Sequence, residues 1–146
     1  MTDQNSVVAS TTNAHTVEAF LFALRDEDFD GADALLADDL VYENVGLPTI
    51  RGRARAMKLF RAMQGRARFD VVFHRNVGEG STVLNERTDA LILGPLRLQF
   101  WVCGVFEVHD GRITLWRDYF DTLDMVKATV RGIAGVAVPA LRPRFR

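Results

Sequence analysis

Four strand-like segments follow one another in the second half of the chain, with only short turns between them. Val, Leu and Phe are frequent in these segments, and the turns are Gly78 to Ser81, Gly94-Pro95 and Asp110-Gly111. Consecutive strands joined by such short turns pair antiparallel, so this region predicts a four-stranded meander. We expect its strands over residues 69–77, 82–93, 96–108 and 112–120.

Helical patterns flank this meander. Apolar side chains repeat at helical spacing over residues 16–26, 29–36 and 52–64, and a last helix is expected from Asp121 onward. A short strand is expected over residues 40–45, and the polar residues 1–12 are expected to be a flexible lead-in. Helices grouped apart from a run of strands predict an α+β fold, in which a curved mixed β-sheet wraps around helices and encloses a pocket.

The length and charge of the chain restrict its organisation and partners. Its 146 residues predict a single domain over 1–146, and its net charge of −1 gives no global field that would attract nucleic acid or anionic lipid. The N-terminus lacks the basic and apolar regions of a signal peptide, and no apolar run approaches the ~20 residues of a membrane span. We therefore expect a cytoplasmic protein without a membrane span and without a nucleic-acid partner.

Charged residues occur inside the second strand of the meander. Alternation along a strand places Arg87 and Asp89 on one face, and Glu86 and Thr88 on the other. If the first face lines a pocket, its charges persist only when they are paired, and they are then candidates for proton chemistry.

Two further strands carry polar residues on a face that is otherwise apolar. Asp118 alternates with Trp116 and Phe120, while Tyr42 and Asn44 share one face of the short first strand. Taken from the residues alone, Asp118 has two roles open to it: a structural ion pair with Arg87, or catalysis.

These residues resemble a known family. Tyr42-Glu43-Asn44, Glu86-Arg87-Thr88-Asp89 and Trp116-Arg117-Asp118-Tyr119-Phe120-Asp121, in that order and spacing, are similar to the limonene-1,2-epoxide hydrolase family. The resemblance extends from Thr16 to about Val130. That family belongs to the cone-shaped α+β superfamily of nuclear transport factor 2, ketosteroid isomerase and the SnoaL-type polyketide cyclases, so the resemblance implies a cone with a deep apolar pocket.

The resemblance also implies a role for each of five residues. Asp118 would be the general base for an attacking water, which Tyr42 and Asn44 would hold. Asp89 would be the general acid that protonates the epoxide oxygen, and Arg87 would lie between the two carboxylates. Ring opening to a vicinal diol would be one concerted step without a covalent intermediate.

The chemistry of these residue types agrees with such roles. With both carboxylates ionised, the group of Asp89, Arg87 and Asp118 carries a charge of −1, and retaining one proton makes it neutral, which burial favours. One acid and one base then arise from the same residue type. His15, His74 and His109 have no ligand spacing, so no metal or cofactor is expected.

An apolar pocket favours a small lipophilic epoxide as substrate, of the terpene, fatty-acid or sterol type. By analogy with the fold, we expect a homodimer packed through the outer face of the sheet. Two alternatives remain open. One is a ketosteroid-isomerase-like or polyketide-cyclase-like enzyme, and the other is a non-catalytic module that binds a hydrophobic ligand.

Overall fold

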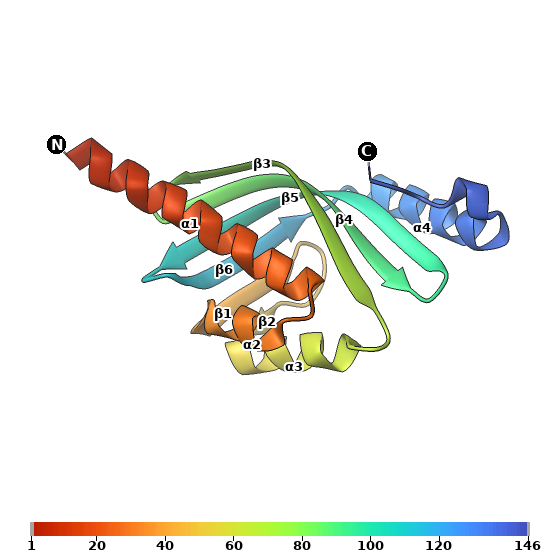
Figure 1. Cartoon of the computed structure of the whole chain (residues 1–146), viewed down its shortest axis with the longest axis horizontal. Helices are drawn as coiled ribbons and strands as arrows, with labels where there is room; N and C mark the ends of the chain where they lie inside the picture. Colours follow the sequence, from red (N-terminus) through yellow and green to blue (C-terminus); the bar gives the residue numbers. More distant parts are fainter. Residues whose placement is uncertain (1, 146) are drawn as a thin grey trace.

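A strongly curved sheet of six strands dominates the computed structural model, which describes residues 2–145 (Figure 1). The strands are β1 (Leu36–Asn44), β2 (Ile50–Arg51), β3 (Arg68–Glu79), β4 (Thr82–Leu93), β5 (Leu96–His109) and β6 (Arg112–Tyr119). The helices are α1 (Thr2–Arg25), α2 (Phe29–Ala34), α3 (Arg53–Met63) and α4 (Thr122–Ala137), followed by the short 3-10 helix η1 (Pro139–Leu141).

The sheet is mixed, with the strand order β2-β1-β6-β5-β4-β3. Strands β3 to β6 form the predicted antiparallel meander, while β1 pairs parallel with β6. The α+β fold with a curved mixed sheet is therefore confirmed. Strand β2 was missed because two residues are too short to show any periodicity.

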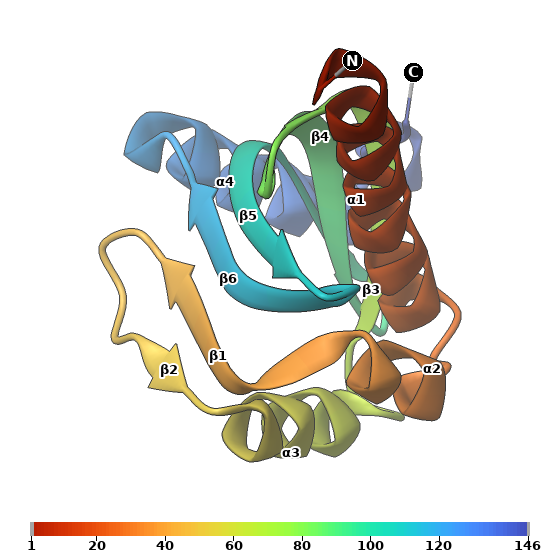
Figure 2. The ribbon, with the colours of Figure 1, turned by 90° about the vertical axis from the view of Figure 1, so that its left-hand side faces the viewer.

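The helices α1, α2 and α3 lie against the concave side of the sheet (Figure 2). Phe20 of α1 is fully buried and meets Trp116 of β6 edge to face, with ring centroids 5.2 Å apart. Trp116 also stacks between Phe106 and Tyr42, with ring centroids 5.8 and 4.3 Å away. This aromatic group fixes the distance between α1 and the strands that carry the candidate site residues.

The start of the first helix differs from the prediction. Residues 2–12, expected to be a flexible lead-in, form the N-terminal part of α1. Tertiary contacts hold them: the Gly80 N–H donates to Ser10 Oγ at 2.9 Å, and Asn13 Nδ2 donates to the Gly80 carbonyl at 3.1 Å. Because these partners lie on the distant β3-β4 hairpin, no local pattern in the sequence could indicate them.

The second helix and the first strand also meet earlier than predicted. Helix α2 ends at Ala34, and β1 begins at Leu36 instead of residue 40. The Ile113 N–H donates to the Leu35 carbonyl at 2.8 Å, and Leu36 pairs with Ile113 of β6. Strand pairing therefore takes the chain out of the helix before its apolar pattern ends.

Helix α4 begins where it was predicted. The Asp121 carboxylate caps it by accepting from the N–H groups of Leu123 and Asp124, at 2.7 and 3.1 Å. Within residues 2–145, no helix is both long and apolar enough to cross a bilayer.

Candidate active site

A cavity of about 500 Å³ opens on the concave side of the sheet. Its walls are mostly apolar and come from helices and strands that are far apart in the sequence. The main aromatic and aliphatic side chains of the wall are Phe29, Phe60, Phe69, Leu91, Phe100 and Phe120. A cavity of this size and lining fits a small lipophilic molecule.

All five residues singled out in the sequence meet at this cavity. Tyr42, Asn44, Asp89 and Asp118 line it, and Arg87 lies directly behind the two carboxylates. Asp89 and Asp118 are 4% and 2% exposed, and Arg87 is fully buried. Asp89 and Asp118 therefore lie on the same face of the sheet, next to one guanidinium.

Every N–H group of the Arg87 guanidinium has an acceptor. Nε and Nη2 donate to the two Asp89 oxygens at 3.0 and 2.8 Å, and Nη1 and Nη2 donate to the two Asp118 oxygens at 3.0 and 2.8 Å. The fifth donor, on Nη1, reaches Asn85 Oδ1 at 2.9 Å. A guanidinium has five such donors in a fixed plane, so a lysine could not replace these bonds.

The strand register explains how residues so distant in sequence meet. Asn85 of β4 pairs with Gly104 of β5, Gly104 pairs with Asp118 of β6, and Asp118 pairs with Asn44 of β1. These four residues form one row across four neighbouring strands. Arg87, two residues beyond Asn85 on the same face, extends its side chain back over this row.

Two members of this row, Asn85 and Gly104, were not identified from the sequence. A Cβ on Gly104 would lie 2.5 Å from Arg87 Nη1, 2.6 Å from Asn85 Oδ1 and 3.0 Å from Asp118 Oδ1. The guanidinium therefore occupies the space that any other side chain at position 104 would need. A signal did exist for Asn85, because strand alternation puts it on the same face as Arg87 and Asp89.

Burial and neighbouring charges shift the pKa of three groups at this site. Burial is the main cause that raises the pKa of Asp89 above the ordinary range of a carboxyl group; the charge of Asp118 adds to it, and Arg87 opposes it. Burial alone would lower the pKa of Arg87, but the two carboxylates outweigh it and raise that pKa, so the guanidinium stays charged. Burial also raises the pKa of Tyr42 to about 12, so its hydroxyl keeps its proton at neutral pH.

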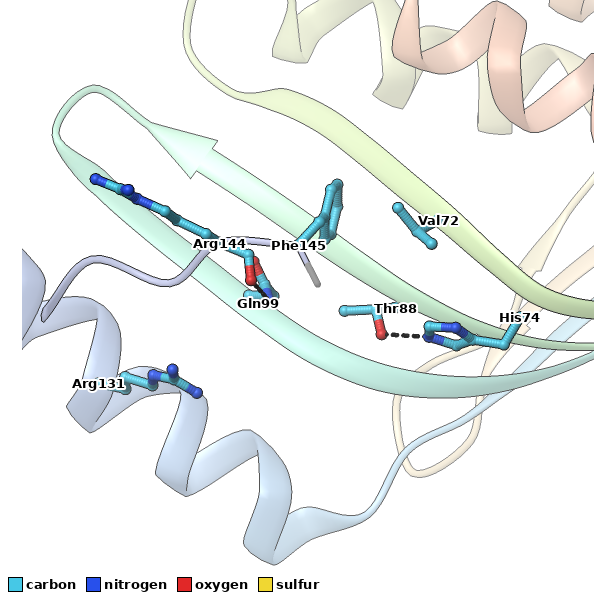
Figure 3. Close-up of a pocket in the computed structure, with 7 residues that line it drawn as sticks. All are labelled: Val72, His74, Thr88, Gln99, Arg131, Arg144 and Phe145. Carbon is cyan, nitrogen blue, oxygen red and sulfur yellow. Dashed lines mark hydrogen bonds between the residues drawn. The ribbon is translucent and has the colours of Figure 1, made fainter.

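The outer face of the sheet carries the alternate residues of the same strands. Glu86 pairs there with Arg75, and Glu43 pairs with Arg117 at 2.8 Å, so both glutamates point away from the cavity as strand alternation predicts. A second cavity of about 340 Å³ lies on this face, between the sheet, α4 and the C-terminal segment (Figure 3). His74 lines it and is hydrogen-bonded to Thr88 at 2.8 Å, which accounts for this histidine without a catalytic role.

Neither face offers an evident metal site. Among residues 2–145, no three His, Cys, Asp or Glu side chains gather closely enough to hold a metal ion. The chemistry available to the larger cavity from this chain is thus that of two carboxyl groups, a hydroxyl and an amide beside one guanidinium.

Comparisons with known proteins agree with this geometry. The sequence profile of the limonene-1,2-epoxide hydrolase catalytic domain matches residues 11–131. Epoxide hydrolase EphG of Mycobacterium tuberculosis is 64% identical over 126 residues, which cover 86% of this chain and 85% of that protein.

Comparison with solved structures also finds similarity to an epoxide hydrolase. The structure of an M. tuberculosis LEH-like epoxide hydrolase superposes with a TM-score of 0.92 at 60% identity, covering 94% of this chain and 98% of the other. An NTF2-like protein of Burkholderia xenovorans superposes with a TM-score of 0.66 at 22% identity, covering 82% and 97% of the two chains. The second similarity concerns the fold alone and places the chain among cone-shaped NTF2-like folds.

Proposed function

Because this chain belongs to the limonene-1,2-epoxide hydrolase family, we propose that its larger cavity opens a lipophilic epoxide to a vicinal diol in one concerted acid-base step. The family match makes the chain an epoxide hydrolase. The residue roles, the concerted step and the class of epoxide are our proposal.

One observation carries the proposal: two buried carboxyl groups share a single guanidinium at the polar end of an apolar cavity. Two ionised carboxylates and one guanidinium would leave a net charge of −1 in a poorly solvated place. Retention of one proton relieves this charge, and burial, which raises the pKa of Asp89, favours that proton on Asp89. The two aspartates can therefore serve as acid and base at the same pH.

Each step then has a residue that can carry it out. Tyr42 and Asn44 orient a water, and the Asp118 carboxylate takes one of its protons as the water oxygen attacks an epoxide carbon. The carbon-oxygen bond breaks as Asp89 donates its proton to the epoxide oxygen. The product is a diol, with Asp118 protonated and Asp89 ionised, and return of one proton from Asp118 to Asp89 resets the site.

The lining of the cavity favours a lipophilic epoxide as the substrate. The walls present aromatic and aliphatic groups, and the polar groups lie together at one end. An epoxide carried on a terpene, fatty-acid or sterol skeleton would place its oxygen at the polar end and bury its hydrocarbon against the wall.

The alternatives considered from the sequence are not favoured. An isomerase, a cyclase and a non-catalytic binder share the fold, but the relatives that are 60% identical or more are described as epoxide hydrolases. A hydrophobic-ligand binder would also have no use for a shared guanidinium between two buried acids.

Turnover of a panel of lipophilic epoxides in heavy-oxygen water tests the proposal. We expect a diol that carries the heavy oxygen from the first turnover, because water attacks the substrate directly. A covalent ester on an aspartate would instead deliver an unlabelled carboxylate oxygen in the first turnover. Mass spectrometry of a single-turnover reaction separates the two outcomes, and no diol from any epoxide would contradict the proposed activity.

The pH dependence of kcat/KM is expected to be bell-shaped. A paired acid and base give such a profile because each must be in its active protonation state, and the alkaline fall is the loss of the proton from Asp89. Because burial raises the pKa of Asp89, the alkaline fall begins above the usual range of carboxyl groups. The residual activity of Asp89→Asn should lack this alkaline fall, whereas a flat profile of the unaltered enzyme from acid to neutral pH would contradict the paired mechanism.

We further propose that the protein forms a homodimer through the outer face of its sheet. Support comes from large apolar side chains exposed on that face, namely Val77, Leu84, Trp101 and Tyr119. A cytoplasmic location stays a prediction of the sequence.

A further inference from the structure

Basic residues are concentrated in one short part of the chain. Residues 50–69 contain seven Arg or Lys side chains and no Asp or Glu, although the chain as a whole has a net charge of −1. This segment comprises β2, α3 and the start of β3. The net charge of the whole chain therefore conceals a strongly positive local surface.

Only two of these seven residues form ion pairs among residues 2–145. Arg53 contacts Asp38 at 2.6 Å and Asp33 at 3.4 Å, and Arg61 contacts Asp30 at 2.8 Å. The others are exposed and have no carboxylate within ion-pair distance in that part of the chain. They are Arg51, Arg55, Lys58, Arg66 and Arg68.

The positive segment borders the mouth of the active-site cavity. Arg68 and Leu59 both line this cavity, as do Val45 and Leu47 from the loop between β1 and β2. Leu59, Val45 and Leu47 are nevertheless 41%, 43% and 64% exposed, so they form an apolar rim at its opening. In Figure 2, α3 lies below β1, and this loop extends at the left from the end of β1.

We propose that the apolar rim and the unpaired basic residues of this segment dock on an anionic lipid bilayer. The cations would attract the surface, and the rim would enter its interfacial layer. An acidic residue, Glu27, also lines the cavity, and its carboxylate would oppose this attraction.

The arrangement favours a bilayer over other anionic partners. The phosphates of a nucleic acid bind basic side chains and its unpaired bases stack on aromatic ones, so the exposed aliphatic rim would have no counterpart there. The rim is also continuous with the apolar cavity wall. A lipophilic epoxide dissolved in the bilayer could then enter the cavity without crossing water, and this last step rests on the proposed function.

Co-sedimentation with vesicles tests the docking without any substrate, so its outcome is independent of the catalytic proposal. We expect binding to vesicles of equal parts phosphatidylcholine and phosphatidylglycerol, little binding to phosphatidylcholine alone, and weakening by added salt. Lys58→Glu should lower the partition coefficient at least about fivefold, because each basic residue near such a surface contributes about that factor. Leu47→Ser should lower it by a similar factor through loss of apolar burial.

Matched controls use the far end of the fold. Arg112→Glu at the β5-β6 turn changes the net charge by the same amount as Lys58→Glu, and Val8→Ser on the N-terminal part of α1 removes an aliphatic side chain as exposed as Leu47. Both controls should bind vesicles like the unaltered protein. Equal loss in Arg112→Glu and Lys58→Glu would overturn the proposal in favour of a general charge effect, and absence of binding to anionic vesicles would overturn it outright.

Discussion

Replacing Asp118 with asparagine should lower kcat by about 10²–10⁴-fold, because an amide cannot take a proton from the attacking water. The change is nearly isosteric, and the new side-chain amide could still accept from Arg87 through its one oxygen. Substrate affinity should therefore change much less than kcat. Single-turnover diol formation measures the chemical step directly.

A matched control separates loss of the base from loss of the fold. Asp39→Asn removes an exposed carboxylate from β1, far from the guanidinium, and should leave kcat unchanged. Thermal unfolding of both variants should show cooperative transitions, with a lower Tm for Asp118→Asn because the buried Arg87 loses one charged acceptor. Turnover of Asp118→Asn near that of the unaltered enzyme would remove Asp118 from the role of base.

Replacing Arg87 with methionine should destabilise the fold by about 3–5 kcal/mol at neutral pH. The substitution removes all five hydrogen bonds of the guanidinium and leaves two buried carboxyl groups facing each other without a cation. Urea unfolding at several pH values measures the effect. The loss should shrink as the pH falls, because a protonated carboxyl group is buried without a cation at less cost than an ionised one.

Two companion variants sharpen the interpretation of this loss. Arg112→Met removes an exposed arginine at the β5-β6 turn and should change the free energy of unfolding by less than about 0.5 kcal/mol. Arg87→Lys keeps the charge without the planar set of donors, so its stability should lie between those of Arg87→Met and the unaltered protein. Full stability of Arg87→Met at neutral pH would mean that the guanidinium is not what holds the two acids together.

Strand alternation was the most reliable guide from sequence to site. It correctly separated Arg87 and Asp89 from Glu86 and Thr88, and the Gly-containing turns correctly divided the four long strands. Such features are local, since a side-chain direction depends only on the residue's position along its own strand. Asp118 of β6 and Asp89 of β4 lie together although β5 separates their strands. This proximity was predicted only from the family resemblance.

Features that depend on partners from distant segments were missed or misjudged. The N-terminal part of α1 contacts the β3-β4 hairpin through Ser10, and the early start of β1 depends on pairing with Ile113 of β6. The local charge of residues 50–69 was hidden by the near-neutral total, because acidic residues elsewhere in the chain balance it. For the helix and the strand, the deciding information is a position in space that periodicity along the chain does not contain, whereas the charged segment is visible once charge is counted locally.

Because of Gly104, the active site can assemble only when β4 and β5 pair in the correct register. A slip of β5 by two residues would keep the same face inward but bring Val102 or Phe106 opposite Asn85. Either side chain would fill the place of the guanidinium, so the misaligned molecule could be compact and well hydrogen-bonded yet unable to assemble its acids. Activity per molecule would thus report the fraction of chains whose hairpin closed in the correct register.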